Sequence, residues 1–138
     1  MSAQSLILIF KRSSDYLDEF ERIKLMNIQI FGTKKCNDTK KAERFFKERG
    51  IKFQFVDMKE KGMSKGELLS VMQVNGGIEG ILDQNSRDKD MLALIKYISD
   101  EDKLQKVLEN QQVIKTPIVR NGKISTLGYQ PDIWKTWE

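Results

Sequence analysis

The first regular pattern of hydrophobic and polar residues has the order strand, helix, strand. Residues 28–31 are a short, mostly apolar run that predicts a buried strand. Apolar residues over 42–49 then recur at helical spacing, and Gly50 stands where a helix usually ends. Residues 51–57 alternate between apolar and polar, which predicts a second strand. A strand–helix–strand unit of this length predicts two parallel neighbouring strands.

The next pattern is helical and has a clear start. Ser64 and Glu67 have the spacing of a capping box, in which each side chain bonds the backbone of the other residue. Leu68, Leu69 and Met72 are expected to face the core. A pair of glycines ends this pattern and predicts the end of the helix.

Two further helices are expected before the chain returns to strand. Residues 83–90 predict a polar loop, and the apolar residues over 91–98 predict an amphipathic helix. Ser99 marks the start of another helix. Because these helices fall between two groups of strands, residues 62–111 are expected to form an inserted helical segment.

The last pattern predicts a hairpin followed by a short helix. Residues 118–126 read as two strands, and Asn121-Gly122 predicts a type I′ turn because both residue types tolerate a positive φ. Gly128 ends the second strand. Residues 130–137 predict a helix with a proline near its first position.

Taken in order, these elements predict an α/β fold of the thioredoxin type. The expected core is a mixed four-stranded sheet, with the helical segment inserted between its two halves. Residues 26–138 are expected to form this domain. Residues 1–25 have a different pattern and are expected to be a peripheral N-terminal extension, in which case Met26 would be the natural first residue. The alternative is an N-terminal strand or helix that packs on the domain.

Composition narrows the possible functions. The chain has 138 residues, of which 39% are hydrophobic and 32% charged, as in a single globular domain. No run approaches a membrane span, so no membrane partner is expected. The net charge of +4 is small, and direct nucleic-acid binding is not expected. There is no histidine, which excludes Cys-His and Ser-His catalysis and histidine zinc sites; no metal site is expected.

The only cysteine has the setting of a reactive thiol. Cys36 follows a strand that ends at Gly32 and directly precedes a helix, whose first amides and dipole stabilise a thiolate. Lys34 and Lys35 add positive charge beside it. The alternative is that Cys36 is a small buried hydrophobe. A single cysteine excludes an internal disulfide and favours a cytoplasmic protein.

Several short motifs together resemble one family. They lie in residues 32–42, 50–51, 116–123 and 128–129, and with them the chain from Asn27 to about Trp137 resembles the ArsC family. That family includes glutaredoxin-coupled arsenate reductases and the Spx-type transcriptional regulators. The resemblance implies a thioredoxin fold, a cis-proline loop at Thr116-Pro117 opposite the thiol, and Cys36 as the nucleophile.

In the arsenate reductases three arginines surround the oxyanion, and this chain matches them only in part. Arg87 corresponds to the first. Thr116 stands at the second, and the third falls near Tyr129. Arg120 lies further along the same strand as the proline and is an additional candidate. Because threonine and tyrosine do not replace a bidentate guanidinium, arsenate is not favoured as the natural substrate.

The resemblance leaves two functions open. A thiol oxidoreductase would use Cys36 alone and bind its ligand with Asn37, Asp38, Thr39, Arg87, Thr116 and Pro117, with Lys34, Lys35 and Arg120 as further candidates. It would hold no bound cofactor, and glutathione or another small thiol would be its co-substrate, with a glutaredoxin-type reductant as partner. The alternative is an Spx-like regulator that binds RNA polymerase. Spx-type proteins have a second cysteine where this chain has Thr39, so an internal redox switch is excluded.

Overall fold

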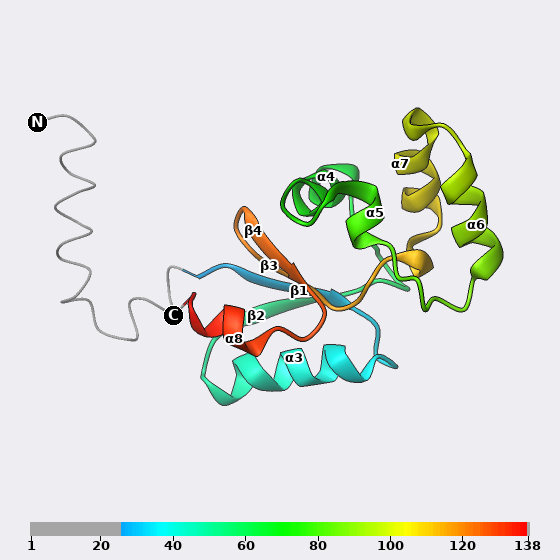
Figure 1. The fold of residues 1–138 in the computed structure, drawn as a ribbon. Coiled ribbons are helices and arrows are strands. Elements are labelled where there is room, and N and C mark those ends of the chain that lie inside the picture. Colours follow the sequence, from blue (N-terminus) through cyan, green and yellow to red (C-terminus); the bar gives the residue numbers. More distant parts are fainter. Residues whose placement is uncertain (1–25, 138) are drawn as a thin grey trace, which may run out of the picture.

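A mixed four-stranded sheet runs through the middle of the molecule (Figure 1). The computed structural model describes residues 26–137; the extension expected at residues 1–25 lies outside them. The strand order is β2-β1-β3-β4, with β1 parallel to β2 and the other neighbours antiparallel. The strands are β1 (Ile28–Gly32), β2 (Phe53–Asp57), β3 (Ile118–Asn121) and β4 (Ile124–Leu127). This confirms the predicted sheet.

One face of the sheet is covered by α3 (Asn37–Glu48) and α8 (Pro131–Lys135) (Figure 1). The apolar face of α3 buries Phe45 and Phe46, and α8 buries Trp134 completely. The Phe45 and Trp134 rings lie 5.3 Å apart in an edge-on arrangement, which adds to their hydrophobic stabilisation. The Trp134 indole N–H donates to Thr126 Oγ1 at 2.8 Å, so the buried polar group is satisfied.

An inserted helical segment between β2 and β3 lies on the other side of the sheet (Figure 1). It comprises α4 (Lys65–Val74), α5 (Gly77–Ile81), α6 (Lys89–Tyr97), α7 (Asp100–Glu109) and the 3₁₀ helix η2 (Gln111–Val113). The helices α4 and α5 lie next to the strands, and α6 and α7 lie beyond the strand ends (Figure 1). Buried side chains from these helices pack with Phe31, Val56 and Ile118 of the sheet in one apolar cluster. The thioredoxin-like fold with a helical insertion is therefore confirmed.

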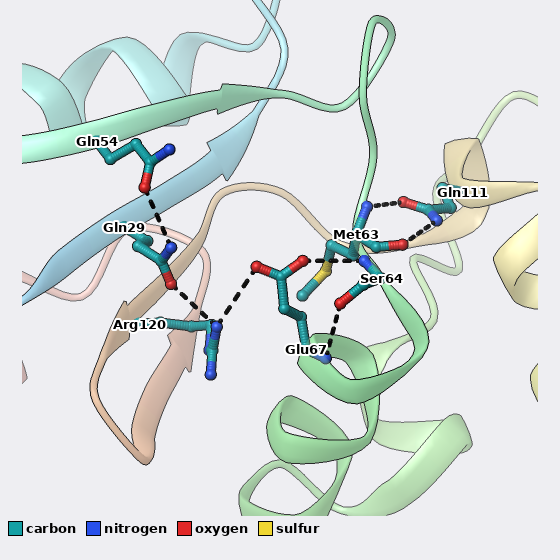
Figure 2. Close-up of polar contacts among 7 residues, drawn as sticks. All are labelled: Gln29, Gln54, Met63, Ser64, Glu67, Gln111 and Arg120. Carbon is teal, nitrogen blue, oxygen red and sulfur yellow. Dashed lines mark hydrogen bonds and ion pairs between the residues drawn. The ribbon is translucent and has the colours of Figure 1, made fainter.

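Side-chain hydrogen bonds hold the insertion to the sheet (Figure 2). The capping box of α4 is present, because Ser64 N–H donates to Glu67 Oε1 and Glu67 N–H donates to Ser64 Oγ. Glu67 also lies 3.6 Å from Arg120 Nη1, which donates to Gln29 Oε1 at 2.9 Å. The Gln111 amide bonds both backbone groups of Met63, at 2.7 and 2.9 Å, and joins the two connections of the insertion.

The helical segment differs from the expectation in three places. Leu69 was expected to face inward but is 44% exposed, and Val71 is buried in its place, because it shares the sheet-facing side with Leu68. The short helices α5 and η2 were not predicted. The helix α6 begins at Lys89, inside the expected polar loop, because Asp88 caps it through Met91 N–H.

The predicted type I′ turn at Asn121-Gly122 is wrong. Asn121 pairs with Ile124, so the two turn residues are Gly122 and Lys123. Gly122 has a φ of +63°, and no non-glycine residue in the described part of the chain has a positive φ. A positive φ at the first turn position alone is typical of a type II′ turn, which also fits the twist of a hairpin.

None of the helices formed by residues 26–137 has the length and apolar character needed to cross a membrane.

Candidate functional site

The thiol lies where β1 meets the first helix. Cys36 is the N-cap of α3, and the cap position has extended backbone angles. Its N–H donates to Thr33 O at 3.1 Å, and its carbonyl accepts from Lys40 N–H at 3.2 Å. The sequence predicts the helix start directly after Cys36, as observed, and Asn37, Asp38 and Thr39 lie in the first turn. The sulfur therefore faces the free amides at the helix start.

The loop before β3 approaches the sulfur from the opposite side. The Thr116–Pro117 peptide bond is cis, as predicted. The Thr116 hydroxyl donates to Cys36 Sγ at 3.4 Å, and the Thr116 carbonyl oxygen lies 3.9 Å from the same sulfur. The thiol donates to this carbonyl, so two residues 80 positions apart in the chain share two hydrogen bonds at the sulfur.

A second threonine lies behind the sulfur in the first turn of α3. Thr39 is fully buried, and its hydroxyl makes no hydrogen bond of standard distance and angle with any residue from 26 to 137. Its side chain occupies the space beside Gly32, where an added Cβ would overlap the Thr39 side chain. Glycine at the end of β1 is therefore required for Thr39 to reach this position.

Four groups around Cys36 determine its ionisation. Partial burial raises the pKa of the Cys36 thiol, because it disfavours the charged form. The hydrogen bond from the Thr116 hydroxyl, and then the Thr39 hydroxyl and the Thr39 and Asp38 amides, which donate to the thiolate form, outweigh this effect and lower the pKa below the ordinary thiol value. The Thr39 contribution fits its unpartnered hydroxyl, since a thiolate is a much better acceptor than a thiol.

A cleft opens beside the thiol, between the sheet and the inserted helices. Its volume is about 650 Å³. Thr33 and Thr116 form its wall nearest the sulfur, and Arg87 lies on the wall supplied by the loop before α6. The cleft lining also includes residues 58–62, which follow β2. It has room for a ligand larger than a simple oxyanion.

The candidate residues divide into those at the thiol and those elsewhere. Thr39, Thr116 and Pro117 surround Cys36, and Arg87 lines the cleft. Lys34 and Lys35 are exposed in the loop before the thiol, and Asn37 is exposed in the first turn. Arg120 lies on the sheet with Gln29 and Glu67, away from the thiol, because it is on β3 three residues beyond the proline.

Sequence reasoning missed several residues that line the cleft. They include Thr33, Lys59, Lys61 and Ser86. A signal for two of them was present, because β1 and β2 are parallel and their carboxyl ends meet at one edge of the sheet. The loop after β2, with Lys59 and Lys61, was therefore bound to lie beside the loop after β1. Within the described part of the chain, no three acidic, histidine or cysteine side chains are grouped so as to hold a metal ion.

A family model, a sequence relative and several solved structures resemble this chain. The model of the ArsC family matches residues 31–137. The global transcriptional regulator Spx 2 of Oceanobacillus iheyensis is 27% identical over 111 residues, covering 78% of this chain and 80% of that protein. A putative ArsC family related protein from Bacteroides fragilis has a TM-score of 0.71 at 16% identity, covering 83% and 99% of the two chains. An arsenate reductase from Vibrio cholerae has a TM-score of 0.70 at 21% identity, covering 82% and 98%.

Proposed function

The chain belongs to the ArsC family, and from this membership we propose that it is a thiol-dependent oxidoreductase that uses Cys36 alone. Its co-substrate is an external thiol of the glutathione or glutaredoxin type. The observation that carries the proposal is the donation from the Thr116 hydroxyl to Cys36 Sγ at 3.4 Å, at a thiol whose pKa is lowered. A structural cysteine has no need of such donors.

The reaction is two successive thiol–disulfide exchanges. The Cys36 thiolate attacks one sulfur of a small disulfide, forms a mixed disulfide with it and releases the other half as a thiolate. An external thiolate then attacks the mixed disulfide at the sulfur of the bound half. This second step restores the Cys36 thiolate and leaves a disulfide between the external thiol and the bound half. Full reduction of the original disulfide to two thiols therefore consumes two external thiols, which end as their own disulfide. No second protein cysteine is needed.

Arsenate fits this site less well than a thiol ligand. Thr116 stands where the arsenate reductases have an arginine, and its hydroxyl is directed at the sulfur. Arg120 is engaged with Gln29 and Glu67 on the sheet. Arg87 is therefore the one arginine that lines the cleft. A single guanidinium does not provide the several bidentate contacts that hold a tetrahedral dianion.

A pair of turnover assays tests this function. We expect the protein to catalyse the glutathione-dependent reduction of hydroxyethyl disulfide, and to give no arsenate reduction above background when supplied with glutathione and glutaredoxin. Arsenate turnover faster than disulfide turnover would contradict the proposal, and so would the absence of both activities from folded protein.

Arg87 is proposed to bind an anionic group of the ligand. Its side chain is exposed on the cleft wall, and its guanidinium has no ion pair with any residue of the described range. Exposed ion pairs contribute up to about 1 kcal/mol, so Arg87→Gln should slow the formation of the Cys36–glutathione disulfide from glutathione disulfide about three- to fivefold at low salt. The rate at which Cys36 reacts with uncharged hydroxyethyl disulfide should stay the same, and Lys96→Gln on α6 serves as the control. An equal fall for both disulfides would exclude this role.

A second function is favoured by one comparison. The similarity to Spx 2 supports a regulator that binds RNA polymerase without a redox switch, since Thr39 replaces the second cysteine. Co-purification with polymerase from cell extract, compared between the unchanged chain and Cys36→Ser, separates the two functions. Binding that is retained in Cys36→Ser would favour the regulator. The absence of polymerase would exclude it.

A further inference from the structure

Positive charge is concentrated around the thiol. Residues 34–49, which contain Cys36 and α3, carry seven lysines and arginines and three carboxylates. Their net charge is therefore +4, the same as that of the whole chain, and the rest of the chain is neutral overall. A local excess of this kind produces an attractive field for anionic molecules at one end of the protein.

Part of this charge forms a stripe that begins at the thiol. Lys40, Arg44 and Lys47 follow Cys36 at spacings of four, four and three, so they lie along one side of α3. All three side chains are exposed. They line a shallow groove of about 480 Å³ together with Glu43 and Glu48.

The cations of the stripe are unpaired although carboxylates are near. No ion pair within 4.0 Å joins Lys40, Arg44 or Lys47 to any residue in the described range. Like charges at this spacing repel and slightly destabilise the helix. No ion pair within the described range relieves this repulsion, whereas a bound anionic surface would.

The dimensions and composition of the stripe indicate the kind of partner. Lys47 lies eleven positions after Cys36 along the helix, a rise of about 16 Å, which is longer than a small thiol can span. Glu43 and Glu48 interrupt the groove and would repel the dense phosphates of a nucleic acid. The stripe ends at a thiol that has no partner cysteine in the chain. All three features fit a protein surface that carries acidic side chains and a thiol or disulfide.

We propose that this stripe, Lys40, Arg44 and Lys47, docks an acidic protein that delivers its thiol or disulfide to Cys36. The inference rests on the proposed function and adds a partner class to it. Association should depend on ionic strength, because exposed charges steer encounter only within about a Debye length.

Two charged peptides provide the test. Each carries one cysteine activated as a 2-pyridyl disulfide, followed by four glutamates in one peptide and four lysines in the other. Attack by the Cys36 thiolate forms a protein–peptide disulfide and releases 2-thiopyridone, which is followed by absorbance. Each rate is divided by that of an uncharged 2-pyridyl disulfide with the same variant, which removes effects on the thiol itself. At about 20 mM salt the glutamate peptide should react at least about tenfold faster than the lysine peptide, and at about 0.5 M salt the two should be equal.

Matched charge reversals locate the effect. The stripe variant combines Lys40→Glu, Arg44→Glu and Lys47→Glu. It should lose the preference for the glutamate peptide. The control variant combines Lys65→Glu, Lys96→Glu and Lys123→Glu, at exposed positions on α4, α6 and the hairpin. It changes the net charge by the same amount and should keep the preference for the glutamate peptide. Equal losses in the two triple variants would overturn the proposal, because they would show an effect of net charge alone.

Other outcomes separate the docking surface from the proposed oxidoreductase function on which it rests. A wild-type thiol that reacts with the uncharged probe but shows no charge preference would overturn the docking surface and leave the oxidoreductase proposal standing. A thiol that does not react with the uncharged probe would overturn both. Binding of a labelled DNA duplex that is lost only in the α3 triple variant would reassign the stripe to nucleic acid and also overturn the proposal.

Discussion

Replacing Cys36 with serine is expected to reduce thiol–disulfide turnover to the rate measured without protein. The chain has one cysteine, so no other side chain can form the mixed disulfide. A serine hydroxyl is not ionised at neutral pH and cannot exchange with a disulfide. The measurement is the glutathione-dependent reduction of hydroxyethyl disulfide, with equal concentrations of both proteins.

The control for this loss is the fold of the variant. Cys36 is only half-buried at the start of α3, and serine is a favourable N-cap residue, so Cys36→Ser should keep the circular dichroism spectrum and the midpoint of thermal unfolding within a few degrees. Turnover that survives in a folded Cys36→Ser protein would show that the activity does not use this thiol.

Removing the two threonine hydroxyls is expected to raise the pKa of Cys36. Burial already raises this pKa, and the Thr116 and Thr39 hydroxyls, which stabilise the thiolate, lower it. Thr116→Val and Thr39→Val each delete one donor to the thiolate, worth about 1.5 kcal/mol for a charge-assisted bond. The thiolate fraction rises with pH through the pKa, so each variant should lose reactivity at low and neutral pH and regain it at alkaline pH.

The measurement for the two threonines is the pH dependence of iodoacetamide alkylation. Below the pKa, each valine variant should react about tenfold more slowly than the unchanged chain. Thr116→Ser and Thr39→Ser retain a hydroxyl and should restore most of the lost rate. If the serine and valine variants shift the pH profile of alkylation by the same amount, packing and not hydrogen bonding controls the pKa of Cys36.

Three helices were predictable because their sequence signals are local. The apolar spacing in residues 42–46, the capping box of Ser64 and Glu67 and the proline at the start of α8 each specify one element, and all three are present. The hairpin turn was misplaced by one residue, because Asn-Gly suits a type I′ turn and the register is decided by strand pairing. The short helix α5, with two glycines in its five residues, has no helical signal of its own.

The order of elements along the chain predicts which loops meet at the site, but it does not predict which side chains touch there. Cys36 before a helix and Thr116-Pro117 before a strand both have local signatures, and in a thioredoxin-type order the two meet. The Thr39 side chain packs against Gly32, and no pattern of residue spacing in the sequence predicts this contact. Arg120 illustrates the opposite case, since its neighbours Gln29 and Glu67 are determined by sheet register and by the docking of α4 (Figure 2).

The most direct measurement is the intact mass of the protein after incubation with glutathione disulfide at neutral pH, followed by addition of reduced glutathione. The proposal predicts one glutathionyl group per chain, located on Cys36 by peptide mapping, and its complete removal by the reduced thiol. An unmodified mass under conditions that modify a free cysteine peptide would contradict it, and so would an adduct that reduced glutathione does not remove.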